Sequence, residues 1–133
     1  MINRVEKLSL LSEMIAFAKT DTEVKCKKYK FLLGVSQQLD ICRSDFEYLM
    51  KHPIAYKNVE SYSERIIQFH RLVLLMNLEN ERTKKELVKL YNFGLTMGLS
   101  HESINRVLYL MDGFPNKCVP PEVLIDIFKV QYN

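Results

Sequence analysis

The stretch LVLLMNLENERTKKELVKLYNFGLTMGLS, from Leu72 to Ser100, decides the fold class. Its apolar residues recur at three- and four-residue spacing, which is the pattern of amphipathic helices. Thr83 followed by Glu86 is a capping box, so we expect a helix to begin there after a break at LENER. Gly98 stands where a helix end favours a left-handed residue, and Ser100 then starts another helix. This one stretch therefore predicts the end of one helix, a complete second helix and the start of a third.

The same pattern continues in both directions and predicts an all-α protein, a single-domain helical bundle. Glycine and proline, four of each, are scarce enough to leave long intervals for helices. Further capping boxes are expected at Asn3 with Glu6, Ser44 with Glu47, and Ser61 with Glu64. We expect about seven helices. The first covers about residues 4–19, the second follows TDTEV, and a short third one runs from Ser44 to near His52. Three more begin at Ser61, Thr83 and Ser100, and Pro120 and Pro121 open the last one.

The order long, long, short helix occurs twice, at an offset of about 58 residues. The offset places apolar positions on one another: Leu8 on Ile66, Leu11 on Phe69, Ile15 on Val73, and Leu32 on Leu90. Two such units, at about 4–52 and about 60–111, would each need the other to bury their apolar faces. We therefore expect one domain over residues 1–133, with an approximate internal twofold and a C-terminal helix at about 120–131 outside the repeat.

Composition excludes several classes of protein. The chain has 133 residues, of which 47% are hydrophobic and 26% charged, and its net charge of +3 does not by itself indicate nucleic acid. No apolar run approaches the roughly 20 residues of a membrane span, and the N-terminal residues lack the features of a secretory signal, so a cytoplasmic protein is expected. Three widely spaced cysteines suit reduced thiols. Without a nucleophile motif, phosphate loop or dinucleotide fingerprint, the sequence does not predict an enzyme.

Two parts of the sequence, LLSEMIAFAKTDTEV followed by FLLGVSQQLDI, and the stretch from Leu72 to Ser100, resemble the repeated pattern of the TerB-like family, named from tellurite-resistance operons. The resemblance covers roughly residues 5–111. It implies a small cytoplasmic helical bundle with a pseudo-twofold, acidic loops suspected of binding metal, and a link to stress response with membrane-associated partners. The chain departs from the family pattern at Thr22 and Asn80, where glycine is usual.

Four carboxylates in the two acidic segments, TDTEV and LENER, are the candidate metal ligands: Asp21, Glu23, Glu79 and Glu81. If the internal twofold brings the segments together, they offer hard oxygen ligands for calcium, magnesium or manganese. The alternative is that both segments are turns between helices, because acidic residues before a helix stabilise its positive end. Neither segment fits the spacing of an EF-hand loop.

Two lysine clusters lie at matching repeat positions and give a second interpretation. They are Lys25, Lys27 and Lys28 in the first repeat and Lys84 and Lys85 in the second. Clustered ammonium groups could bind an anion, nucleic acid or an anionic membrane surface, although a solvated helical face explains them more simply. No nucleic-acid motif accompanies them.

The last predicted helix either completes the core or docks on a partner through Phe128 and Tyr132, with a dimer contact among the alternatives. Together these observations predict a non-enzymatic interaction or sensing module with a protein partner, linked to stress by the resemblance and to a divalent cation by the acidic segments. The rival is a basic adaptor that binds nucleic acid or anionic lipid through the lysine clusters.

Overall fold

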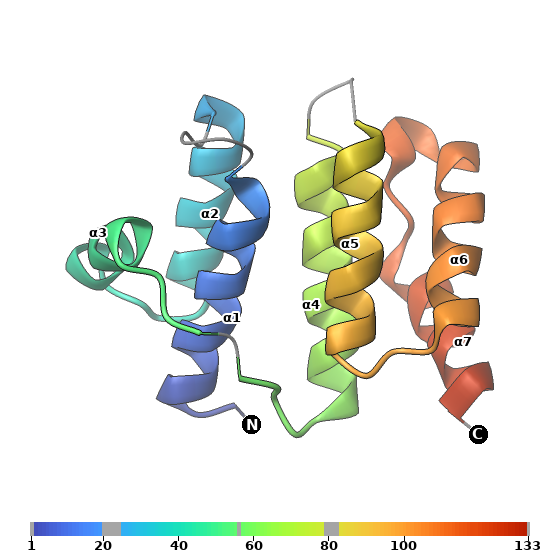
Figure 1. Ribbon diagram of the computed structural model, residues 1–133, viewed down its shortest axis with the longest axis horizontal. Coiled ribbons are helices and arrows are strands. Elements are labelled where there is room, and N and C mark those ends of the chain that lie inside the picture. The colour runs from blue at the N-terminus through green and yellow to red at the C-terminus, as the bar shows by residue number, and fades with distance from the viewer. Residues whose placement is uncertain (1, 20–24, 56, 79–82, 133) are drawn as a thin grey trace. The chain divides into compact units, whose positions relative to one another are not determined.

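The computed structural model describes residues 2–19, 25–55, 57–78 and 83–132, and in these ranges the chain is helical with no strand (Figure 1). The α-helices are α1 (Arg4–Ala18), α2 (Cys26–Gln38), α3 (Arg43–Lys51), α4 (Tyr62–Met76), α5 (Lys84–Thr96), α6 (His101–Leu110) and α7 (Pro121–Tyr132). Two 3-10 turns, η1 (Met111–Gly113) and η2 (Pro115–Lys117), join α6 to α7. The prediction of an all-α fold is confirmed.

The chain divides into two compact units, residues 1–61 with α1 to α3 and residues 62–133 with α4 to α7. In the first unit α1 packs against both α2 and α3. In the second, α4 packs against α5 and α7, and α6 packs against α5 and α7. The predicted single domain with an internal twofold stays a prediction.

Helix α1 is buried on more sides than one apolar stripe would require. The sequence places Leu8, Leu11, Ile15 and Ala18 on its inner face, yet Leu10, Met14 and Phe17 are also fully buried and Leu8 is only partly covered. Two hydrophobic packing partners, α2 and α3, lie against this helix within the first unit. Part of the segment that follows α3 also lies against this helix.

That segment is fixed to α1 by two serines, Ser9 and Ser12, each 1% exposed. Ser9 Oγ accepts a hydrogen bond from Lys57 N (2.7 Å) and donates to Lys57 O (3.2 Å). Ser12 Oγ accepts from Ile54 N (2.8 Å) and donates to Ile54 O (2.9 Å). Both hydroxyls therefore satisfy a backbone donor and a backbone acceptor that would otherwise be left without partners beside a helix. We call Ile54 and Lys57 with these two serines the serine clamp.

The helix termini follow the local sequence signals at most positions. The side chains of Asn3 and Glu6, and of Thr83 and Glu86, form two of the four predicted capping boxes. Ser100 Oγ accepts the Ser103 amide at the start of α6. Helix α4 begins directly after Ser61, and α7 begins at Pro121, as predicted. Capping signals are read correctly here because both partners lie within one turn.

The predicted capping box of Ser44 and Glu47 is wrong. Helix α3 begins one residue earlier, at Arg43, and its N-cap residue Cys42 makes no side-chain capping bond. Glu47 instead accepts hydrogen bonds from Arg43 Nε (3.1 Å) and Tyr29 Oη (2.5 Å). A guanidinium and a phenol are stronger donors for a carboxylate than the free amide at the helix start.

The second helix of each unit ends in the same hydrogen-bond pattern, a Schellman motif. In α5, Leu99 N donates to Gly94 O (3.1 Å) and Gly98 N to Leu95 O (2.9 Å), and Gly98 has φ +81° as predicted. In α2, Ile41 N donates to Ser36 O and Asp40 N to Gln37 O, with Asp40 at φ +58°. Asp40 and Gly98 stand at the offset of about 58 residues that the sequence predicts for the repeat.

Close packing at Gly94 sets the position of α5 against α4 and α6. A Cβ atom at this glycine would lie 2.7 Å from Ile104 Cδ1 and 3.0 Å from Phe69 Cε1. All three residues are buried. The absence of a side chain at Gly94 therefore lets α6 approach α5 closely.

Candidate functional site

The predicted metal ligands Asp21, Glu23, Glu79 and Glu81 lie outside the described residues. They belong to the segments that join α1 to α2 and α4 to α5. Among the side chains that the structure does describe, no three His, Cys, Asp or Glu residues gather in a way that could hold a metal ion. The cation site stays a prediction.

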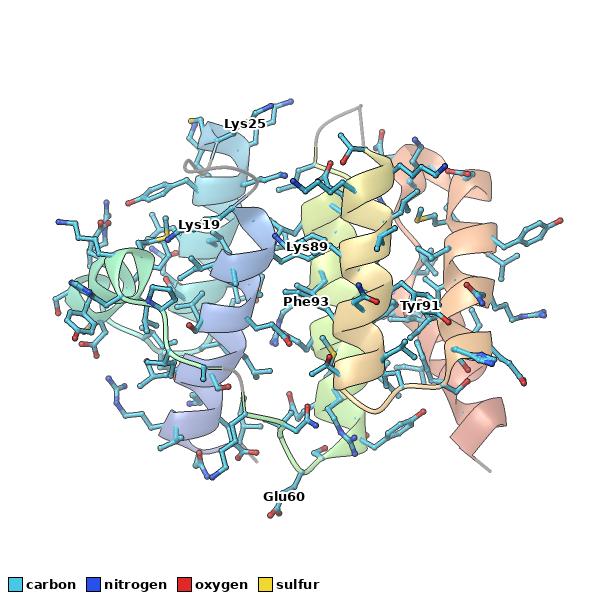
Figure 2. All side chains as sticks on the ribbon, viewed as in Figure 1. Lys19, Lys25, Glu60, Lys89, Tyr91 and Phe93 are labelled. Carbon is cyan, nitrogen blue, oxygen red and sulfur yellow. The ribbon has the colours of Figure 1, made fainter. Side chains whose placement is uncertain are left out.

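The lysine clusters lie at the starts of α2 and α5, one in each unit. Lys25 (Figure 2), Lys27, Lys84 and Lys85 are exposed. Lys28 is different, because only 5% of its surface is exposed. An anion-binding surface would therefore use the exposed lysines without Lys28. A further lysine, Lys19, lies at the C-terminal end of α1 (Figure 2). Its Nζ donates a hydrogen bond to Met50 O (2.8 Å), near the C-terminal end of α3 in the same unit.

The proposed partner contact through Phe128 is wrong. Phe128 is 0% exposed and its ring meets the Phe69 ring edge-on, with centroids 5.7 Å apart. Its carbonyl accepts a hydrogen bond from Tyr62 Oη (3.3 Å). Burying an aromatic side chain contributes more to stability inside a core than at an exposed position, and here α7 completes the core of the second unit. The Tyr132 side chain lies outside the described part of the chain.

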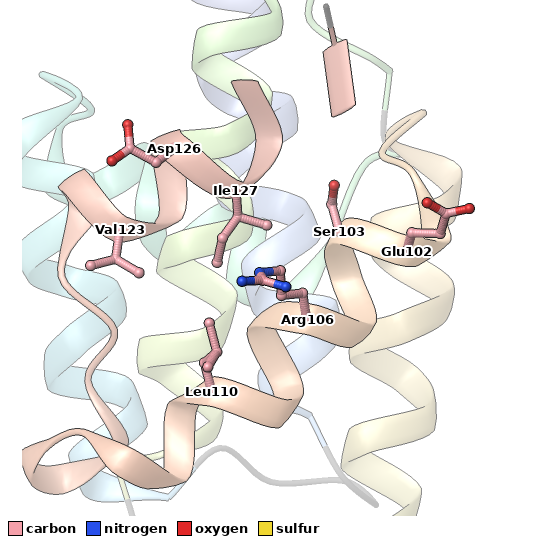
Figure 3. Close-up of a pocket in the computed structure, with 7 residues that line it drawn as sticks. All are labelled: Glu102, Ser103, Arg106, Leu110, Val123, Asp126 and Ile127. Atoms are coloured by element: carbon pink, nitrogen blue, oxygen red, sulfur yellow. The ribbon is translucent and has the colours of Figure 1, made fainter. Parts of the chain in front are cut away.

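Between α6 and α7 lies a groove of about 480 Å³, wholly within the second unit (Figure 3). We call it the α6–α7 groove. The residues that line it are Glu102, Ser103, Arg106, Leu110, Val123, Asp126 and Ile127. Ser103 and Ile127 are buried and form its base, while Leu110 and Val123 are half-buried. The groove therefore combines an apolar base with charged side chains on both helices.

The charged residues of the groove are exposed and carry both signs. Figure 3 shows the Arg106 side chain pointing into the space between the two helices, with the carboxylates of Glu102 and Asp126 to either side and directed away from it. Arg106 makes no hydrogen bond or ion pair with any residue whose side chain is described. A guanidinium with five donors is thus presented on a partly apolar surface, where it can take a carboxylate in a bidentate pair.

An exposed tyrosine extends this surface along α6. Tyr109 is 83% exposed, the largest fraction among the described large hydrophobic residues. It follows Arg106 by three residues, and Arg106 follows Glu102 by four, so all three share one face of the helix. Tyrosine and arginine together are the residues that most often carry the binding energy of protein interfaces. Sequence reasoning missed this face, although the spacing of Glu102, Arg106 and Tyr109 away from the apolar stripe could have indicated it.

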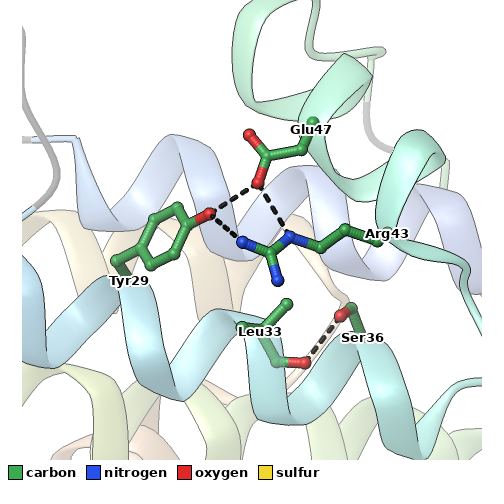
Figure 4. Close-up of polar contacts among 5 residues, drawn as sticks. All are labelled: Tyr29, Leu33, Ser36, Arg43 and Glu47. Atoms are coloured by element: carbon green, nitrogen blue, oxygen red, sulfur yellow. Dashed lines mark hydrogen bonds and ion pairs between the residues drawn. The ribbon is translucent and has the colours of Figure 1, made fainter.

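A second polar cluster joins α2 to α3 in the first unit (Figure 4). Arg43 Nη2 donates to Tyr29 Oη (3.4 Å), and both residues donate to Glu47. The hydrogen bond from Tyr29, followed by that from Arg43, lowers the pKa of Glu47, while the same bond raises the pKa of Tyr29. Below it, Ser36 Oγ donates to Leu33 O (2.6 Å). Tyr29, Arg43 and Glu47 each bond to the other two, so the cluster fits a structural tie between two helices.

No protein-family model, curated protein or solved structure matches the chain. The TerB-like resemblance therefore stays a prediction.

None of the helices in the described ranges is long and apolar enough to cross a membrane.

Proposed function

We propose that this chain is a non-enzymatic interaction module that binds a polypeptide through the α6–α7 groove. The observation that carries the proposal is the position of Arg106, which points into a groove with an apolar base and has no ion-pair partner among the described residues. Anchors of this kind, a guanidinium beside apolar surface with an exposed tyrosine next to it, suit protein recognition.

The chemistry of the groove defines the partner surface. An apolar side chain of the partner would cover Leu110 and Val123, and a carboxylate would pair with Arg106 in a partly water-excluded setting. Basic groups of the partner would meet Glu102 and Asp126. The partner surface is thus apolar at its centre with charges of both signs around it.

A selection from a random peptide library against the purified full chain tests the proposal. Peptides that bind the groove should lose affinity roughly tenfold or more when Arg106 is changed to Glu, because a guanidinium–carboxylate pair becomes a repulsion. Lys85→Glu makes the same change of charge on α5, outside the groove, and should leave their affinity within about a factor of two. The proposal falls if no peptide is enriched, or if both variants bind the selected peptides as wild type does.

The resemblance adds the expectation that binding is stress-linked and responds to a divalent cation held by the acidic segments. The basic-adaptor alternative would use Lys25, Lys27, Lys84 and Lys85, which are exposed. Binding through these lysines to duplex DNA or to anionic vesicles would fall steeply with salt. Binding in the groove, which is partly apolar, would fall less.

A further inference from the structure

We propose that the occupant of the α6–α7 groove is a second copy of this chain, docked face to face about a twofold axis. This inference rests on the proposed function and names its partner. It uses three observations: the charges of the groove, the exposed Tyr109 on the same face of α6, and the half-buried apolar residues of the groove.

The charges are complementary to themselves. In a twofold contact the same surface of both copies is used. If one residue of the first copy contacts a second residue of the other copy, the reverse contact forms as well. A face with only basic residues would repel its copy, whereas this face carries Arg106 between Glu102 and Asp126. In a twofold contact each guanidinium would meet a carboxylate of the other copy, and both pairs would form at once. These three side chains make no ion pair with one another, so the pairing does not compete with one already made.

The apolar part of the face also fits a second copy. Tyr109 is 83% exposed and lies on the same side of α6 as Arg106, and Leu110 and Val123, which line the groove, are half-buried. A twofold contact would cover each of these residues on both copies and so remove their apolar surface from water. Such a contact closes on itself, which gives a dimer and no longer assembly.

Charge reversal tests this arrangement with the full chain. One variant carries Arg106→Glu, and a second carries Glu102→Lys together with Asp126→Lys. Each variant alone sets like charges against one another across the twofold, so each should dimerise roughly tenfold or more weakly than wild type. In an equal mixture the acidic face of the first variant meets the basic face of the second. The mixture should therefore recover dimers, and these should contain one chain of each kind.

Sedimentation equilibrium across a concentration series measures the dimer constants, and a tag of different mass on one variant identifies the mixed dimer. Circular dichroism checks that each variant keeps its helices, as the exposure of all three side chains predicts. Lys85→Glu is the matched control and should dimerise like wild type.

A wild-type chain that stays monomeric overturns the inference, and so do reversed variants that still dimerise or a mixture that fails to restore the dimer. The library selection separates this failure from that of the proposed function. If the wild type is monomeric but Arg106→Glu still abolishes binding of the selected peptides, the groove serves a different polypeptide and only the second copy is excluded.

Discussion

At the scale of single residues, Gly94 shows how one missing side chain controls packing in the second unit. Placing Ala there gains about 1 kcal/mol of helix propensity. It also forces a methyl group to within 2.7 Å of Ile104 Cδ1, beside the Phe69 ring. Overpacking a filled core typically costs about 1–3 kcal/mol, so the steric term is the larger one. We expect Gly94→Ala to lower the free energy of unfolding by about 1 kcal/mol, measured by urea denaturation.

Two further variants make this measurement decisive. Gly34→Ala, in α2, is the matched control, because a Cβ atom there meets nothing within 4 Å and the helix should gain about 0.5–1 kcal/mol. Ile104→Val removes the Cδ1 atom that clashes, so the double variant should be more stable than the sum of the two single changes predicts. Strict additivity would show that Ile104 is not the residue displaced.

At the scale of elements, the serine clamp holds the backbone of Ile54 and Lys57 against α1. Changing Ser9 or Ser12 to Ala leaves a backbone N–H and C=O of Lys57 or Ile54 without partners, at a cost of about 1–3 kcal/mol each. We expect either change to lower the free energy of unfolding by that amount and to speed hydrogen exchange at the Lys57 or Ile54 amide, respectively. Ser63 is an exposed serine in α4. Ser63→Ala should change the free energy of unfolding by no more than about 0.5 kcal/mol and leave exchange at both amides as in the wild type. Unchanged exchange at both amides would contradict the clamp.

Helix boundaries were predictable from the sequence, whereas the clamp was not. Thr83 with Glu86, and the left-handed Gly98, involve residues within one or two turns, so local rules identify them. Ser9 and Lys57 lie 48 residues apart, and nothing local distinguishes Ser9 from a serine that faces solvent. The Ser44 prediction failed for the same reason, since Glu47 is taken by Tyr29 from another helix.

At the scale of the whole molecule, the sequence predicted helices correctly but did not predict the α6–α7 groove. The apolar pattern of α7 is equally suited to a core and to an interface, and burial against Phe69 decides for the core at Phe128. The α6–α7 groove depends on how two helices that are separated by two 3-10 turns pack together. Such packing is a tertiary property, and periodicity along one helix does not specify it.

The cation expectation also belongs to the whole molecule, because its candidate ligands are divided between two segments of the chain. A cation at one hundred times its dissociation constant would add about 2.7 kcal/mol to the free energy of unfolding. For a chain of this length that corresponds to a rise of roughly 10 °C in Tm. We expect such a rise with calcium, magnesium or manganese over chelator, and its loss in the Asp21→Asn, Glu79→Gln double variant.

Thermal melting followed by circular dichroism measures this shift, and the Glu102→Lys, Asp126→Lys variant is the control, since it removes two carboxylates from the groove and leaves the acidic segments intact. A Tm that no ion raises, or that rises equally in the Asp21/Glu79 variant, would assign TDTEV and LENER to helix starts. Their carboxylates would then act on the positive ends of α2 and α5, an effect of about 0.3–1 kcal/mol each that salt screens. In that case the groove would carry the interaction without a cation.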